Sequence, residues 1–209
     1  TFSKILISGD GGDELFGGYI FRYKKFLSLT SKTSTPLEKV KVYLQCHERD
    51  RVADQEKIFN NKCEFSWNSI YNILLPFFDN NLPRLEQVYL ADYNGKLLYN
   101  FNPINSRLTD YFEMNSLTPL LNNKLVNIAP HIASKYKYDV DNLVGKLPLR
   151  NILAKNNAQS LITKEKLGFS VNTTNLWRSY GHDLCKEFLD NSRVVKDGWI
   201  NKDWILKHI

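Results

Sequence analysis

The fold is decided by residues 2–19, which read FSKILISGDGGDELFGGY. Residues 2–7 are a short apolar run rich in β-branched side chains, and this pattern predicts a buried strand. Residues 10–14 form a turn of glycines and acidic side chains, and a helical pattern starts at Leu15. In α/β proteins a strand, a glycine-rich turn and a helix start hold phosphate groups, because backbone N–H groups point at the ligand and glycine lets it approach closely.

Three acidic residues in this turn bear on what it could hold: Asp10, Asp13 and Glu14. They would repel a bare phosphate, whereas Mg²⁺ binds one or two carboxylates together with phosphate oxygens and water. Acidic side chains also occur at helix starts that hold no ligand. The surrounding glycines favour the metal-bound phosphate; they are Gly11, Gly12, Gly17 and Gly18.

Residues 8–19, SGDGGDELFGGY, resemble the second signature motif of the glutamine-dependent asparagine synthetase family, in its synthetase domain. The resemblance implies an adenine-nucleotide alpha-hydrolase-like fold and a reaction that uses ATP and Mg²⁺. In that family the aspartate side-chain carboxylate is adenylated and pyrophosphate is released. Ammonia from glutamine then attacks the aspartyl-adenylate to give asparagine and AMP.

The same resemblance implies roles for individual residues. Asp10 would lie at the reacting carbonyl, and Asp13 would bind the metal and hold Mg²⁺–pyrophosphate. The nucleotide pocket would be lined by the neighbouring residues Ser8, Gly9, Gly11 and Gly12.

Residues 102–122 align with a family segment that contains D-R-x-S-M-A followed by E-x-R-x-P-F-L-D. Polar or charged family residues are replaced at Ser106, Asn115 and Leu117. The last two replace a Glu and an Arg, and a carboxylate near an attacking amine can orient it or take its proton. Glu113, two residues from Asn115, is a candidate substitute. The replacements leave open which acid is activated, which amine attacks, and whether the parent protein is active.

Residues 145–153, GKLPLRNIL, resemble a G-K-x-x-L-R element of the family. Lys146 and Arg150 are spaced to share a helix face. A role on the phosphate side and a solvated basic face are equally open for them.

Residues 164–171, KEKLGFSV, resemble a K-x-G-F element that is followed by a Trp, here Trp177. The family register selects Lys166 as a catalytic and nucleotide-binding residue. Its point charge would stabilise the charge that develops as pyrophosphate leaves or as the tetrahedral intermediate forms. Lys164 is the alternative if the register slips by two residues.

The composition of the 209 residues, with a formal net charge of +6, is ordinary for a soluble globular protein. No membrane span, signal peptide or nucleic-acid recognition motif is visible. Cys46, Cys63 and Cys185 fit neither a disulfide framework nor a zinc site, which predicts a reducing cytoplasm. The expected partners are therefore small molecules, with neither nucleic acid nor membrane, and a homodimer stays open.

In the family, an S-G-G-x-D-S loop that binds ATP lies N-terminal to the SGDGGDELFGGY motif. This loop does not occur in the 209 residues. The glutaminase domain with its N-terminal Cys is also absent, and the chain starts at Thr1 without a Met. We therefore expect residues 1–209 to be a single domain, the C-terminal fragment of a longer synthetase. Its partner would be the missing N-terminal portion, and the fragment alone would not form the adenylate.

The predicted fold is α/β tending to mostly α: a partial nucleotide-binding parallel sheet with one clear strand at the N-terminus, then a predominantly helical C-terminal region. Periodicity predicts a set of helices at 15–29, 37–47, 84–100, 123–133 and 175–189. A prolyl loop is predicted at 76–83. Arg22 is expected on a solvated helix face, and His47 at the surface.

The leading hypothesis is an ATP-dependent amide-forming ligase of the asparagine synthetase type. A relative that joins another carboxylate to an amine, such as a β-lactam- or macrolactam-forming synthetase, is the nearest alternative. A non-catalytic helical interaction module with a degenerate synthetase fold is the alternative from another class. A nucleic-acid-binding module ranks third.

Overall fold

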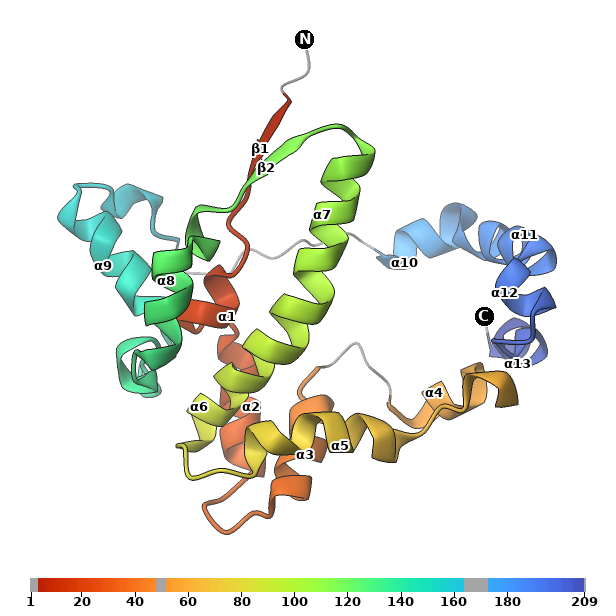
Figure 1. Ribbon diagram of the computed structural model, residues 1–209, viewed down its shortest axis with the longest axis horizontal. Helices are drawn as coiled ribbons and strands as arrows, with labels where there is room; N and C mark the ends of the chain where they lie inside the picture. Colours follow the sequence, from red (N-terminus) through yellow and green to blue (C-terminus); the bar gives the residue numbers. More distant parts are fainter. Residues whose placement is uncertain (1–3, 48–51, 164–172, 209) are drawn as a thin grey trace. The chain divides into compact units, whose positions relative to one another are not determined.

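The computed structural model describes residues 4–47, 52–163 and 173–208 (Figure 1). The chain forms two compact units, Thr1–His47 with Tyr71–Ile162, and Glu48–Ile70 with Thr163–Ile209. Helices predominate among the described residues, and a small parallel sheet includes a strand close to the N-terminus. This confirms the predicted fold class.

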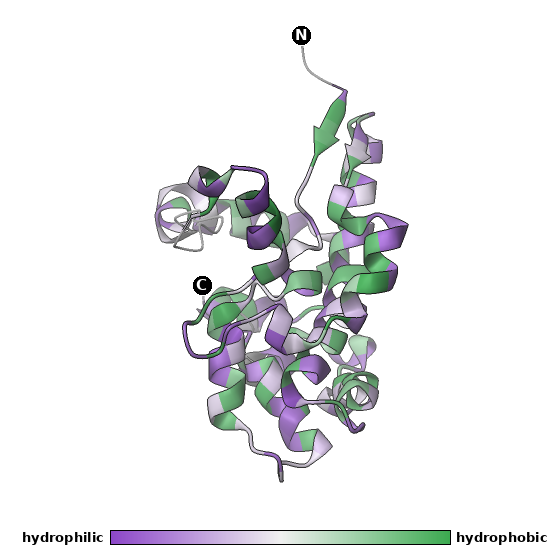
Figure 2. Ribbon diagram, turned by 90° about the vertical axis from the view of Figure 1, so that its left-hand side faces the viewer, coloured by the Kyte–Doolittle hydropathy of each residue, from purple (hydrophilic) through white to green (hydrophobic). Residues whose placement is uncertain are grey.

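The sheet of the first unit contains β1 (Ile5–Ile7) and β2 (Asn115–Leu117), which pair in parallel with Ile5 opposite Asn115. The predicted burial of the first strand is wrong: its side chains are 53%, 43% and 69% exposed. A parallel strand becomes buried when other elements cover both of its faces. Within the described residues the sheet has two strands, and hydrophobic β1 stands uncovered in Figure 2.

The helices of the first unit, in chain order, are α1 (Gly12–Phe16), α2 (Ile20–Leu29), α3 (Pro36–Gln45), α6 (Arg84–Ala91), α7 (Asn102–Tyr111), α8 (Asn123–Ile128) and α9 (Leu147–Lys155). The helix predicted at 15–29 is interrupted, because Gly17 adopts a positive φ of 77° and ends α1. The start of α3 is fixed by a capping box between Thr35 and Glu38.

Helix α5 (Trp67–Phe78) begins in the second unit and ends in the first. It contains Pro76, so the loop predicted at 76–83 starts later than expected. The helix buries Leu74 and Phe78, and this burial offsets the hydrogen bond that a proline inside a helix cannot donate.

The helix predicted at 84–100 is longer than expected. Helix α6, the π-helical segment η2 (Asp92–Phe101) and α7 follow one another without a break, and Figure 1 shows them rising toward β2. Pro103 lies just after the end of η2 and so inside this continuous helix, where it cannot donate the backbone hydrogen bond of an ordinary helical residue. This long helix connects the core of the unit to the end of the sheet.

The second unit is helical in its described part. Its elements are α4 (Val52–Ile58), the 3₁₀ turn η1 (Asn61–Cys63), α10 (Thr173–Leu176), the π-helical segment η7 (Trp177–Gly181), α11 (His182–Asn191), α12 (Arg193–Lys196) and α13 (Lys202–His208). An antiparallel bridge between Phe59 and Ile200 joins its two stretches of chain. The Asn60 N–H donates to the Trp199 carbonyl beside that bridge at 3.1 Å.

Candidate active site

The loop that follows β1 holds the first predicted site residues. The Ser8 N–H donates to the Leu117 carbonyl at 3.0 Å and so extends the strand pairing by one residue. The Asp10 carboxylate then accepts hydrogen bonds from Ser8 Oγ at 2.8 Å and from Asn105 Nδ2 at 2.6 Å. Because Asn105 belongs to α7, the carboxylate is anchored both within its own loop and to the long helix.

Asp10 also lines a cavity of about 470 Å³ between the loop, α7 and β2. The substituted positions Ser106 and Asn115 lie in the wall of this cavity, whereas Leu117 does not. The other lining residues are Asn102, Asn105, Thr109, Asp110, Met114, Ser116, Thr118 and Leu121. The described wall therefore presents amides, hydroxyls and two carboxylates, and no cationic side chain.

Asp13 lies in the first turn of α1 and meets a residue from the G-K-x-x-L-R element. Its Oδ1 is 3.1 Å from Lys146 Nζ, and the two side chains are 26% and 38% exposed. Lys146 precedes α9 and has a left-handed backbone, with φ of 57°. Such a conformation costs a non-glycine residue about 1–3 kcal/mol and is found where the surroundings impose it.

Two glycines allow the loop of Asp13 and the turn of Lys146 to approach. A Cβ added at Gly18 would lie 1.6 Å from Asp13 Oδ1 and 2.5 Å from Lys146 Cε. A Cβ added at Gly145 would lie 2.2 Å from the Gly17 carbonyl oxygen. The clash at Gly145 is with a backbone atom, so this position requires glycine, whereas a Cβ at Gly18 would displace the ends of the Asp13 and Lys146 side chains.

Of the two basic residues in the G-K-x-x-L-R element, Lys146 contacts Asp13 and Arg150 stabilises the turn. The Arg150 Nε donates to the Gly145 carbonyl at 2.9 Å, so this side chain braces the turn that presents Lys146. Lys146 lies just before the helix rather than on its face. The other predicted lysines, Lys164 and Lys166, lie outside the described residues.

Glu14 is separate from the other two acids of the loop. It is 3% exposed and accepts a hydrogen bond from the Tyr19 hydroxyl. Burial raises the pKa of the Glu14 carboxyl. The three-acid arrangement considered from the sequence is therefore reduced to Asp10 and Asp13.

The described residues contain no group of three or more His, Cys, Asp or Glu side chains able to hold a metal, and the three cysteines are free thiols. Magnesium that is shared with phosphate oxygens needs only one or two carboxylates. The partly exposed carboxylate of Asp13 fits this type of ligand set.

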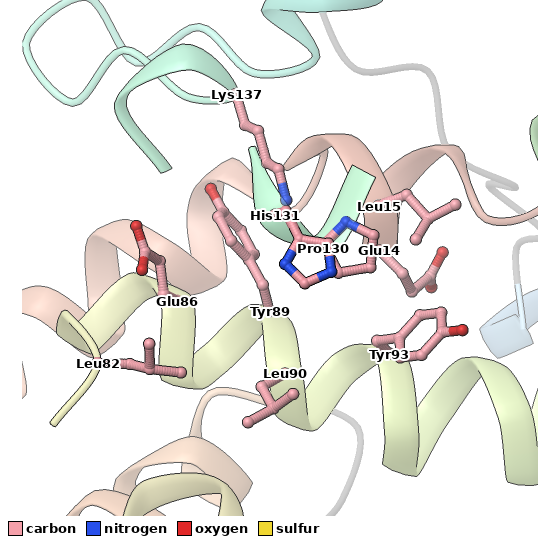
Figure 3. A pocket seen from close by; sticks show the side chains of 10 residues that line it. All are labelled: Glu14, Leu15, Leu82, Glu86, Tyr89, Leu90, Tyr93, Pro130, His131 and Lys137. Carbon is pink, nitrogen blue, oxygen red and sulfur yellow. The ribbon is translucent and has the colours of Figure 1, made fainter. Parts of the chain in front are cut away.

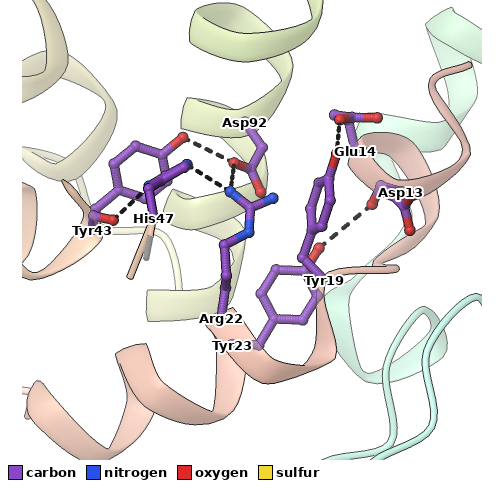
Figure 4. Close-up of polar contacts among 8 residues, drawn as sticks. All are labelled: Asp13, Glu14, Tyr19, Arg22, Tyr23, Tyr43, His47 and Asp92. Carbon is purple, nitrogen blue, oxygen red and sulfur yellow. Dashed lines mark hydrogen bonds and ion pairs between the residues drawn. The ribbon is translucent and has the colours of Figure 1, made fainter. Parts of the chain in front are cut away.

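A buried polar network under the loop was missed by sequence reasoning (Figure 4). Arg22 NH1 lies 3.1 Å from Asp92 Oδ1, and these side chains are 5% and 0% exposed. The Tyr43 hydroxyl donates to the same Asp92 oxygen at 2.9 Å, and His47 Nε2 lies 2.6 Å from Arg22 NH1. The neighbouring residue Tyr23 contacts the loop separately, since its hydroxyl donates to the Asp13 carbonyl at 3.4 Å.

This network corrects two expectations. Arg22 is buried rather than solvated, and His47 is half-buried rather than at the surface. Burial raises the pKa of Asp92, while Arg22 and the Tyr43 hydroxyl act in the opposite direction. The sequence did contain one signal for this network, because Asp92 is an acidic residue within an apolar helical pattern. Its partner Arg22 could not be found from the sequence, since it lies 70 residues away.

The match to known proteins covers the entire chain. Residues 1–209 match the family model described as Asparagine synthase, which defines the protein as an ATP-dependent ligase by class. The chain belongs to the asparagine synthase family. A search of curated proteins and a search of solved structures each found no match. Among the described residues, no helix has both the length and the apolar character needed to span a membrane.

Proposed function

We propose that this chain forms part of an enzyme that makes amide bonds in two steps. A carboxylate, in the first instance the side chain of aspartate, is adenylated by ATP with release of pyrophosphate. Ammonia derived from glutamine then attacks the adenylate and gives the amide and AMP. Family membership and the placement of Asp10 and Asp13 on one loop after a parallel strand support this proposal.

The observation that carries the proposal is the position of Asp10. Its carboxylate is held by two hydrogen bonds at the wall of a cavity large enough for a small acid and its amine. A fixed carboxylate can hold an attacking ammonia or amine in line with a carbonyl and favour the positive charge that the nitrogen acquires. We assign this role to Asp10.

Asp13 and Lys146 have complementary charges on the adjacent loop. Asp13 would bind Mg²⁺ that accompanies pyrophosphate, and the metal would neutralise charge on the leaving group. The Lys146 ammonium, which contacts Asp13 in the absence of ligand, would then turn to a phosphate oxygen. Lys166, by resemblance, would supply a second cation.

The reaction needs the ATP-binding loop that has the sequence S-G-G-x-D-S in the family. This sequence does not occur in residues 1–209. We propose that another part of a longer protein supplies this loop and that residues 1–209 alone are inactive. Pyrophosphate exchange into ATP by these residues alone would contradict this point.

The wall of the Asp10 cavity favours the alternative in which the enzyme joins a carboxylate other than aspartate to an amine. Asn115 replaces the family Glu in that wall, and Asp110 lines the same cavity, whereas Glu113 does not. Asp110 is therefore the better candidate for the missing carboxylate. The described wall also contains no cation. This observation supports a substrate acid or amine that differs from those of asparagine synthesis, as in a β-lactam- or macrolactam-forming relative.

The test is ATP–pyrophosphate exchange by the longer protein, with aspartate and with other carboxylic acids supplied one at a time. We expect exchange that depends on the acid and is at least tenfold slower in Asp13→Asn. Asp10→Asn should retain exchange but slow amide formation, because Asp10 acts on the second step. Absence of nucleotide binding by the longer protein would instead support the helical interaction module.

A further inference from the structure

A second cavity, of about 310 Å³, lies in the first unit and shares no lining residue with the cavity at Asp10 (Figure 3). Its walls come from α1, α6, the start of η2 and the 3₁₀ turn η4 (Ala129–His131), with Lys137 just after the turn η5 (Ser134–Tyr136). Most of the wall is apolar and is formed by Leu15, Leu82, Leu90, Tyr93 and Pro130. A concave, largely apolar site with a few polar groups is typical for a small molecule.

Lys137 is the unusual group in this wall. The residue is 1% exposed, and its Nζ lies 5.0 Å from the centre of the Tyr89 ring. It has no ion-pair partner within 4.0 Å among the described residues. Burial lowers the pKa of Lys137 to about 8, and the charge of Glu86 opposes this shift. A buried ammonium without a direct counter-ion is costly unless something else supplies the opposite charge.

Glu86 and Tyr89 supply two further polar groups in the wall of this cavity, and both can bind a ligand. Glu86 Oε1 accepts a hydrogen bond from the Ser134 N–H at 3.2 Å, but this carboxylate makes no ion pair with Lys137. The buried Tyr89 hydroxyl has no hydrogen-bond partner in the described part of the chain. The cavity thus holds the Lys137 ammonium and the Glu86 carboxylate, which interact through their charges but do not form an ion pair.

The chemistry of the wall limits the ligand. A nucleoside triphosphate would need several cations, and the carboxylates Glu14 and Glu86 would repel it. A fatty acid would leave Glu86 without a cationic partner, and an alkylamine would leave Lys137 without an anionic one. A molecule with a carboxylate, an ammonium and an apolar body would satisfy both charges and the apolar wall.

We propose that this cavity binds an apolar α-amino acid, with its carboxylate on Lys137, its ammonium on Glu86 and its side chain among Leu15, Leu82 and Leu90. The site is independent of the adenylation chemistry proposed at Asp10. Its ligand would contact α1, the helix that carries Asp13, from Glu14 and Leu15.

The experiment is isothermal titration calorimetry of the protein with L-phenylalanine and L-leucine as probes. Phenethylamine lacks the carboxylate and 3-phenylpropionate lacks the ammonium, so each should bind at least tenfold more weakly than phenylalanine. Aspartate should also bind more weakly, because its side chain is charged. Failure of both apolar amino acids to bind, or equal affinity for 3-phenylpropionate, would overturn the proposal.

Two variants and a matched control locate the site. Lys137→Met and Glu86→Gln should each weaken phenylalanine binding at least tenfold. Lys135→Met changes an exposed lysine two residues away and should leave the affinity unchanged. Circular dichroism melting of each variant checks that it folds. Folded Lys137→Met or Glu86→Gln protein with unchanged affinity would show that the ligand does not bind in this cavity.

Discussion

Lys146 Nζ lies 3.1 Å from Asp13 Oδ1, although the two residues come from segments far apart in the sequence. The contact depends on Gly145, where any side chain would collide with the Gly17 backbone, and on Gly18, where a side chain would displace the Asp13 carboxylate and the Lys146 chain. It brings one cation to the carboxylate that the family resemblance connects with the metal and pyrophosphate. The glycine-rich loop and the G-K element therefore form one structural site rather than two separate motifs.

We expect Lys146→Met to slow ATP–pyrophosphate exchange by the longer protein at least tenfold, because a positive charge beside the leaving group is lost. Its effect on the free energy of unfolding should stay below about 1 kcal/mol, since the ion pair is partly exposed. Lys155→Met, which changes an exposed lysine at the far end of α9, is the control. Equal rates for Lys146→Met and wild type would remove Lys146 from the site.

Gly145→Ala should destabilise the protein by about 1–3 kcal/mol, because the added methyl group would lie 2.2 Å from the Gly17 carbonyl oxygen, a backbone atom that cannot rotate away. Gly95→Ala provides a control of opposite sign. Its Cβ would make an ordinary contact 3.9 Å from Leu74, within the helical segment η2, so it should stabilise by about 0.5–1 kcal/mol. Urea unfolding of both variants measures the difference. A neutral Gly145→Ala variant would contradict the close approach of the two loops.

Asp92→Asn should lower the free energy of unfolding by about 3–5 kcal/mol, because Arg22 would remain buried without its counter-charge. Asp197→Asn is the matched control: its ion-pair partner Arg193 is 92% exposed, and its loss should cost at most about 0.5 kcal/mol. Chemical denaturation compares the two. Similar values would mean that Arg22 is solvated, as the sequence suggested.

Lys137→Met should stabilise the protein at pH 7 by about 1–3 kcal/mol, since a lysine with a lowered pKa destabilises the native state in which it is charged. The unfolded chain titrates this lysine near its ordinary value of 10.5, above the folded value of about 8. Between these values the unfolded state binds more protons, so wild-type stability rises with pH. The advantage of Lys137→Met should therefore shrink from pH 7 to pH 10, measured by urea unfolding at each pH.

Ile7→Thr should change the free energy of unfolding by less than about 0.5 kcal/mol, because Ile7 is 69% exposed on β1. Phe26→Ala removes a side chain that is 1% exposed and should cost about 3–5 kcal/mol. Denaturation of residues 1–209 compares them. A large cost at Ile7 would show that β1 is covered.

Much of the architecture was predictable from local pattern. The run of apolar residues before Ser8 indicated β1, and the periodic apolar positions indicated most of the helices, because backbone geometry imposes these periods on neighbouring residues. The glycines and acids at 9–14 indicated the loop, and the family match covers the same residues. Helix ends were less predictable, as at Pro76 and at Gly17, where packing or a positive φ decided the outcome.

By itself, the sequence determined the family, the order of strand, loop and helices, and the residue types available at Asp10 and Asp13. Only the tertiary structure decided that Asp13 meets Lys146, that Asp110 rather than Glu113 lines the cavity of Asp10, and that Arg22 is buried against Asp92. The reason is physical. Periodicity and turn chemistry act over a few residues, whereas a charge chooses its partner by distance in space, which depends on how the whole unit packs.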